Sequence, residues 1–257
     1  MDANAHPQLK IPREDFVNTL PLYVQIAEGL SQQIESGELM PGEKLPPERE
    51  LSRMYGVNRM TLRRALMRLE LQGLLNRRQG AGTYVSEPKI ERKADELVSF
   101  SRGMTRRGYL TGAKLLLFER KPAEGRIAQA LSIPVGAEVY YFHRLRSLDG
   151  EPVMLEEFWM SVDRFPDLVS YDLFYRFIFD IVEDEYGLTV TRARQSLEAV
   201  VATDYEAEML NIEVGSPLML ERRVSFDEQD IPIEYGKDLY RGDRFRFVTE
   251  MSTMEKF

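Results

Sequence analysis

The 257-residue sequence contains no cysteine and only two histidines. Without cysteine the chain can form no disulfide, no thiolate zinc site and no cysteine nucleophile, which is typical of proteins of a reducing cytoplasm. His6 lies in a polar arm and His143 in a strand pattern, so no histidine pair is available to bind a metal or act as a catalytic base. The sequence therefore predicts no metal site, no cofactor and no catalytic residues.

Long apolar runs are also missing from the sequence. None approaches the roughly 18 residues of a membrane-spanning helix, and the polar, acidic N-terminus does not resemble a signal peptide. We therefore expect a cytoplasmic protein without a membrane partner. Residues 1–18 show no periodicity and are predicted to form a flexible arm; an ordered strap across a dimer is the alternative.

Positive charge is scarce overall but concentrated in one segment. The formal net charge is -8, yet residues 44–86 contain nine Lys or Arg and three Glu, which gives this segment +6 and leaves -14 for the rest. A net acidic chain alone argues against a nucleic-acid partner, whereas a local basic segment favours one.

The basic segment contains two helix patterns in close succession. A helix over residues 48–55 ends at Gly56, which tolerates the conformation of a tight turn. Asn58 is a suitable N-cap for the next helix, whose apolar stripe has the spacing i, i+3, i+4 and i+7 and consists of Leu62, Ala65, Leu66 and Leu69. Off the stripe, in the first two turns, lie Arg59, Met60, Thr61, Arg63 and Arg64. This is where a recognition helix contacts base edges in the major groove.

A hairpin and a further helix complete the predicted unit. Residues 74–78 and 83–86 flank Gln79-Gly80-Ala81-Gly82, whose glycines permit the reversal of a wing. Pro21 begins an earlier helix with an i+4 row of apolar residues. We therefore predict a winged helix-turn-helix over residues 19–86. Arg49 and Arg78 are expected to contact phosphate or the groove edge, because a guanidinium suits both phosphate and guanine; a merely solvated arginine face is the alternative.

The remainder of the chain favours a second, mainly antiparallel α+β domain over residues 97–257, after a charged linker at 87–96. Strands are predicted over residues 114–120, 138–147, 152–160, 191–202, 217–226, 231–240 and 245–251. Helices are predicted over residues 126–131, 174–186 and 204–210. Residues 148–151 and 227–230 have the character of hairpin turns, and the Asp-Gly of the first is the stronger signal.

Two arginines of this domain are candidates for ligand binding. Arg144 and Arg146 are two residues apart on one predicted strand, so both side chains lie on the same face and can close on one anion. Equally, they can pair with Glu156 and Glu157 on the adjacent hairpin arm. Trp159 is predicted to pack in the core, with stacking on a ligand as the alternative.

Residues 21–85 resemble the DNA-binding domain of the GntR family of bacterial regulators. The resemblance rests on ESGELMPGEKLPPERELSRMYGVNRMTLRRAL, followed by RRQGAGTYV. It implies DNA contacts from Arg49, Arg59, Thr61, Arg63, Gln79 and Gly80. Met60 stands where a smaller polar residue is expected, which implies a different base preference. Pro47 replaces the usual Ser or Thr cap, so the helix must begin from the fixed φ of proline.

Residues 93–253 are similar to UTRA, the effector-binding domain of the HutC subfamily, which has a chorismate-lyase-like fold. The landmarks are SFSRGMTRRG, YYFHRLRSLDGEPVMLEEFWM and IPIEYGKDLYRGDRFRF. The similarity implies a pocket whose hydroxyl donors and carboxylates suit a sugar, formed by Ser101, Arg144, Arg146, Glu156, Glu234 and Tyr240. It also places Asp172 in this pocket, where phosphosugar-binding members often have Ser, and a carboxylate there disfavours phosphate.

Together, the two resemblances imply a homodimeric transcriptional regulator, most often a repressor. It would bind a palindromic operator and release this double-stranded DNA when a small anionic metabolite, a phosphosugar or a carboxylate, enters the UTRA pocket. An activator or a ligand-independent DNA-binding protein is the alternative. A lyase-like enzyme is a further alternative, because the second domain resembles a lyase scaffold.

Overall fold

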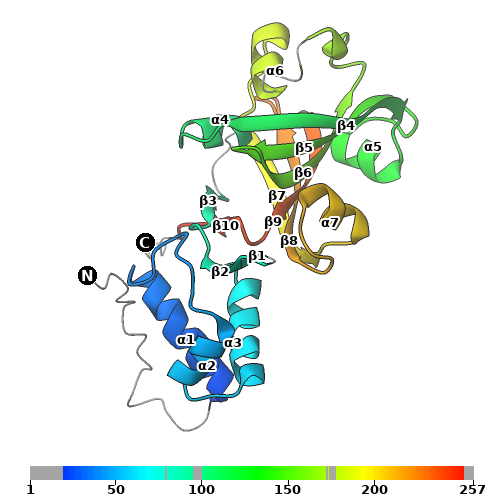
Figure 1. The fold of residues 1–257 in the computed structure, drawn as a ribbon. Coiled ribbons are helices and arrows are strands. Elements are labelled where there is room, and N and C mark those ends of the chain that lie inside the picture. The colour runs from blue at the N-terminus through cyan, green and yellow to red at the C-terminus, as the bar shows by residue number, and fades with distance from the viewer. Residues whose placement is uncertain (1–19, 79, 95–99, 172, 174–177, 252–257) are drawn as a thin grey trace, which may run out of the picture. The chain divides into compact units, whose positions relative to one another are not determined.

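The computed structural model describes residues 20–78, 80–94, 100–171, 173 and 178–251. The chain divides into two compact units, Met1–Ile90 and Glu91–Phe257 (Figure 1). This division falls within the predicted linker. The predicted arm at residues 1–18, together with Gln79 and Asp172, lies outside the described residues.

The first unit has the elements of a winged helix-turn-helix. Its helices and strands are α1 (Leu22–Glu35), α2 (Glu48–Met54), α3 (Arg59–Leu71), β1 (Leu75–Arg78) and β2 (Gly82–Val85). β1 and β2 pair in antiparallel register from Leu75 opposite Val85 to Arg78 opposite Gly82. The predicted helix-turn-helix and wing are therefore confirmed.

Local sequence explains where these helices begin and end. Asn58 caps α3, because its side chain accepts a hydrogen bond from the Thr61 amide at 2.8 Å. Pro47 precedes α2 with φ of -55° and supplies no side-chain cap, as predicted. Gly56, in the turn between α2 and α3, has φ of +64°, which explains why a glycine stands there. The predicted stripe of α3 is buried in the core of this unit.

The second unit is built on one antiparallel sheet in the order β4-β5-β6-β9-β8-β7. Its strands are β4 (Thr111–Pro122), β5 (Glu138–Leu148), β6 (Glu151–Ser161), β7 (Arg192–Val201), β8 (Pro217–Phe226) and β9 (Pro232–Arg241). Its helices are α4 (Phe100–Thr105), α5 (Gly125–Leu131), the short 3-10 helix η1 (Leu168–Ser170), α6 (Ile178–Tyr186) and α7 (Asp204–Leu210). Both predicted hairpins are present, since β5 pairs with β6 and β8 with β9.

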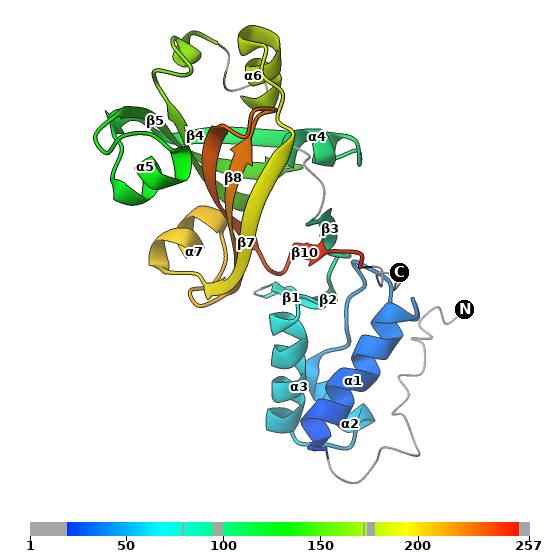
Figure 2. The ribbon, with the colours of Figure 1, turned by 180° about the vertical axis from the view of Figure 1, so that it is seen from behind.

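Helices cover both faces of the sheet (Figures 1 and 2). α6 packs on one face with Phe142 and Phe158, which lie opposite each other on β5 and β6. α5 packs on the other face with Trp159, so the predicted core position of this tryptophan is confirmed. α7 packs on this second face as well. In the described part of the chain, no helix has the length and apolar character needed to cross a membrane.

The structure corrects the sequence analysis at the start of this unit. The predicted linker contains β3 (Ile90–Lys93), which pairs with β10 (Phe245–Val248) in a separate two-stranded sheet. The last predicted strand therefore does not join the main sheet. One buried apolar residue, Ile90, is too little to create a strand pattern among charges, so the pairing depends on a partner far along the chain. α4 was also not predicted.

The packing of α3 gives a test of the first core. Leu69→Ala should lower the free energy of unfolding of this unit by about 2–5 kcal/mol, because it leaves a cavity at a fully buried side chain. Met67→Ala, on the same helix but 58% exposed, should cost about 0.5 kcal/mol or less. Urea denaturation combined with hydrogen exchange of the α3 amides measures both effects. Equal losses in the two variants would contradict the assigned core.

Candidate functional site

The exposed face of α3 carries the first candidate site. Arg59, Met60, Arg63 and Arg64 are exposed, and Met60 has 63% of its surface accessible. These residues occupy the first two turns, whereas the buried stripe faces α1 and α2. The sequence placed these four side chains on the outer surface correctly. Their arrangement suits the insertion of the helix into a major groove.

An acidic residue of α2 ties the recognition helix to the wing. Glu48 accepts a hydrogen bond from Arg63 Nε at 2.8 Å and forms an ion pair with Arg77 Nη2 at 3.3 Å. Neither pairing was predicted, because the three residues are far apart in the sequence. Both arginines remain more than half exposed. If Arg63 contacts a base, its guanidinium must either break its hydrogen bond to Glu48 or bind Glu48 and the base at the same time.

The other residues predicted to contact DNA differ in their hydrogen bonds, exposure and backbone conformation. Thr61 donates its hydroxyl to Asn58 Oδ1 at 3.1 Å, so only its oxygen lone pairs remain available. Arg49, on α2, is exposed. Gly80 has φ of +74° in the wing turn, and Arg78 stands opposite Gly82 at the end of the wing strands. Gln79 lies outside the described residues.

The second candidate site is a buried ion-pair cluster on the α6 face of the sheet. Glu156 on β6 lies opposite Arg144 on β5. Its Oε2 is 2.7 Å from Arg144 Nη2 and 3.6 Å from Arg146 Nη1. Arg146 Nη2 also donates to the hydroxyl of Ser101 on α4. The structure therefore brings four of the predicted pocket residues into contact.

This geometry shows that the predicted pairing of the arginines with a carboxylate is present, whereas their binding of a ligand stays a prediction. Both guanidiniums do pair with a carboxylate, but they share Glu156 instead of taking one acid each. Glu157 projects to the opposite face, where it accepts from Tyr141 at 2.8 Å and from Lys237 at 2.6 Å. The predicted pairing with Glu157 is wrong, because adjacent residues of a strand point to opposite faces.

Burial and charge oppose each other in this cluster. Burial disfavours the ionised carboxyl of Glu156, but Arg144 and Arg146 outweigh burial and hold its pKa below the ordinary value. Burial lowers the pKa of Arg146, and its Nε is buried with no hydrogen-bond partner among the described residues. Arg144 and Arg146 share one directly paired carboxylate, and Asp238, which lies opposite Glu156 on β9, also acts electrostatically on Arg146.

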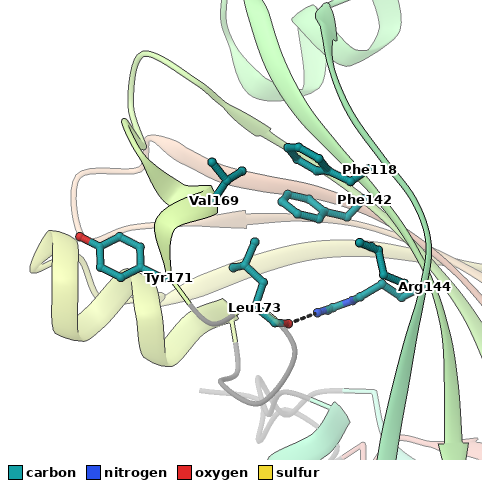
Figure 3. A pocket seen from close by; sticks show the side chains of 7 residues that line it. Phe118, Phe142, Arg144, Val169, Tyr171 and Leu173 are labelled. Atoms are coloured by element: carbon teal, nitrogen blue, oxygen red, sulfur yellow. Dashed lines mark hydrogen bonds between the residues drawn. The ribbon is translucent and has the colours of Figure 1, made fainter.

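A cavity of about 140 Å³ lies beside Arg144 (Figure 3). Phe118 and Phe142 form its wall on the sheet, and Val169, Tyr171 and Leu173 face them from the segment between β6 and α6. Arg144 Nη1 donates to the carbonyl oxygen of Leu173 at 3.3 Å. Arg144 is the one charged residue among the described residues that line this cavity. A ligand here would meet a cation at one end and apolar side chains elsewhere.

Sequence analysis missed these apolar lining residues. Phe142 precedes Arg144 by two positions, so strand alternation alone could have placed it on the same face. The contribution of Val169, Tyr171 and Leu173 depends on the tertiary fold, and no sequence pattern indicated it. Asp172, which was predicted to belong to the pocket, lies outside the described residues.

The remaining predicted pocket residues belong to a neighbouring part of the same sheet face. Glu234 binds Arg223 at 3.0 Å and accepts from Ser225 at 3.0 Å. Tyr240 is buried beside Phe100 of α4, at 6.3 Å between ring centroids. In the described part of the chain, neither residue forms a hydrogen bond or ion pair with Arg144, Arg146 or Glu156, so their role in a pocket stays a prediction.

Arg223 organises an acidic cluster that the sequence did not reveal. Glu221 lies 3.1 Å and Asp238 3.5 Å from Arg223 Nη1. Burial raises the pKa of Asp238 well above its ordinary value, and nearby carboxylates reinforce this effect against the opposing charge of Arg223. One guanidinium therefore holds three buried acids together, Glu221, Glu234 and Asp238.

Comparisons with known proteins agree with both units. The family described as "Bacterial regulatory proteins, gntR family" matches residues 22–85, and the UTRA domain matches residues 106–246. The transcriptional repressor NagR of Bacillus subtilis is 34% identical over 235 residues, covering 91% of this chain and 96% of NagR. The chain belongs to the gntR family of bacterial regulators and carries a UTRA domain.

Two further relatives of this gntR-family protein extend the comparison. The mannosyl-D-glycerate transport/metabolism system repressor MngR of Escherichia coli is 32% identical, covering 89% of this chain and 95% of MngR. The crystal structure of PhnF from Mycobacterium smegmatis superposes with a TM-score of 0.63 at 29% identity, covering 88% of this chain and 98% of PhnF. These are DNA-binding transcriptional regulators, so the alternative of a lyase-like enzyme is set aside.

The shared carboxylate of the gntR-family protein can be tested by removing its charge. Glu156→Gln should lower the free energy of unfolding by about 3–5 kcal/mol at neutral pH, because it leaves two buried guanidiniums without their anion. Since the native pKa of Glu156 is depressed, its contribution is complete above the unfolded-state pKa and is lost as the pH falls through the native value. The native protein and the variant should therefore converge in acid, as measured by denaturation at several pH values.

Glu198→Gln is the matched control on the same sheet. Glu198 is half exposed and pairs with Arg222, so its loss should cost about 1 kcal/mol or less. A cost for Glu156→Gln no larger than this, or one that does not change with pH, would contradict the assigned electrostatics.

Proposed function

We propose that this protein is a homodimeric, ligand-responsive repressor that leaves its operator when a small anionic metabolite binds the UTRA domain. The observation that carries the proposal is the Arg144 cluster, in which two buried guanidiniums share one carboxylate at the edge of an apolar cavity. The same chain presents arginines on the exposed turns of a recognition helix. A DNA-reading surface and an anion-accepting cavity are the two parts that such a switch requires.

Dimerisation follows from the size of the DNA-reading surface. One recognition helix contacts too few base pairs to compete with the non-specific sites of a genome. Two copies related by a two-fold axis read two half-sites, and this accounts for a palindromic operator. The UTRA domain is the proposed platform for the dimer.

The chemistry of the cavity supports an effector with one anionic group and a less polar body. A carboxylate or phosphate can accept from Arg144 in place of the Leu173 carbonyl, whose hydrogen bond at 3.3 Å is long. The apolar side chains opposite then contact the rest of the molecule. The name of MngR includes mannosyl-D-glycerate, which is a carboxylate, and so agrees with this class of ligand.

The contacts of the cluster suggest how binding reaches the DNA-binding unit. Arg146 holds Ser101 of α4, and α4 follows the segment that enters the UTRA domain. A ligand that binds Arg144 competes with its hydrogen bond to Leu173, and one that binds Arg146 competes with its hydrogen bond to Ser101. In a dimer, this favours one arrangement of the two winged units over another, and a shift between arrangements alters operator affinity.

The recognition helix is tested by Arg59→Ala. The variant should weaken binding to a DNA site selected from a random library by about 1–3 kcal/mol at fixed salt, because a base or phosphate contact is lost. A mobility-shift assay measures the affinity. Arg120→Ala, which removes an exposed arginine of β4 paired with Glu138, should leave it unchanged. Equal affinities of all three proteins would remove Arg59 from the DNA-reading surface.

The effector site is tested by Arg144→Ala. In a thermal-shift screen of sugar acids, sugar phosphates and other carboxylates, a ligand at 100 times its Kd should stabilise the native protein by about 2.7 kcal/mol. Arg144→Ala should abolish this shift and keep DNA binding without ligand, whereas Arg192→Ala, an exposed arginine of β7, should keep both. A variant lacking Arg144 that still responds fully to the same ligand would show that the pocket lies elsewhere.

A further inference from the structure

The face of the sheet that bears α5 and α7 contains a groove at its β7 end. Strand register places Trp159, Tyr235, Val224 and Arg194 in one row across β6, β9, β8 and β7. The next row toward α7 includes Arg222. The groove has a volume of about 460 Å³ and is lined by side chains of three strands and of α5. This size lies within the range of small-molecule sites.

The groove is basic. Its lining includes Arg126 of α5, Arg194 of β7, and Arg222 and Arg223 of β8, and the described lining residues include no Asp or Glu. Arg222 pairs with Glu198, and Arg223 pairs with Glu221, Glu234 and Asp238. Within the described residues, no carboxylate lies within ion-pair distance of Arg126 or Arg194. An anion bound next to these two guanidiniums supplies the counter-charge that they lack.

This groove is separate from the proposed effector pocket. Strand pairing places Arg144, Glu156 and Asp238 in one row on the α6 face. Arg222 belongs to the adjacent row, which begins at the residue just before Arg144 on β5. Adjacent residues of a strand point to opposite faces, so the two sites lie on opposite sides of the sheet. Occupation of one does not fill the other.

We propose that the α5 groove is a second anion site, which binds a small phosphate-bearing molecule. Planar guanidinium groups supplied by three different elements suit the several oxygens of a phosphate better than one carboxylate. Tyr235 provides an aromatic wall next to the cations, which suits the ring of a phosphorylated sugar or base. Phosphate oxygens bind Arg126 and Arg194, and the rest of the molecule lies against Tyr235.

The chain contains a reporter for this groove. Trp159, the only tryptophan in the sequence, stacks on Tyr235 with ring centroids 5.4 Å apart. Binding next to Tyr235 should therefore change the fluorescence of Trp159. Titration of the full-length protein with inorganic pyrophosphate should give a saturable fluorescence change and a matching calorimetric signal.

Charge-neutral variants test the assignment. Arg126→Gln combined with Arg194→Gln should weaken pyrophosphate binding at least about tenfold, because two charge-assisted hydrogen bonds are lost. Arg192→Gln is the matched control, since Arg192 lies on the same strand but already pairs with Asp230 at 2.7 Å. This control should bind pyrophosphate as tightly as the native protein.

Three outcomes would overturn the proposal. The first is the absence of both signals at millimolar pyrophosphate, which is also the result expected if the groove is covered by a second copy of the chain. The second is unchanged binding in the double variant, which would locate the anion elsewhere, for example on the arginines of α3. The third is equal weakening of pyrophosphate binding in Arg192→Gln and in the double variant, which would show that any lost positive charge of the sheet has the same effect.

Discussion

The interaction on which the UTRA unit depends is the sharing of Glu156 by Arg144 and Arg146. Burying a charge costs several kcal/mol unless a partner offsets the loss of hydration. Here one carboxylate stabilises two guanidiniums. The positions of these groups are fixed by backbone pairing, because Arg144 lies directly opposite Glu156. The ion pairs therefore cannot separate unless the strands separate.

Strand register also separates the chemistry of the two faces. On β5, Arg144 faces the cavity under α6, whereas His143 points to the side of α5 and α7. On β8, Arg223 binds Glu234 on the first face and Arg222 lines the groove on the second. A shift of one residue in either pairing would exchange these sets and bury the wrong charges. The same antiparallel sheet therefore presents different arginines on its two faces, Arg144 on one and Arg222 on the other.

Sequence reasoning succeeded where the signals were local. The cap at Asn58, the turn at Gly56 and the Asp-Gly hairpin before β6 depend on neighbouring residues, and each was predicted. It failed where a partner lies far along the chain. Tertiary contacts produce the pairing of β3 with β10, the hydrogen bond from Arg63 to Glu48 and the acidic cluster around Arg223. For the candidate pocket, alternation placed both arginines on one face, but only the fold shows that they share Glu156.

The pairing of Glu48 with Arg63 bears on how the winged unit meets DNA. An exposed pair of this kind contributes about 0–1 kcal/mol, so the predicted DNA contact of Arg63 would displace it at little cost. Until then the pair limits the freedom of a long side chain and reduces the entropy lost on binding. Glu48 lies in the first turn of α2, where the helix dipole favours a negative charge. It therefore remains stabilised after Arg63 departs, and the exchange leaves no isolated buried charge behind.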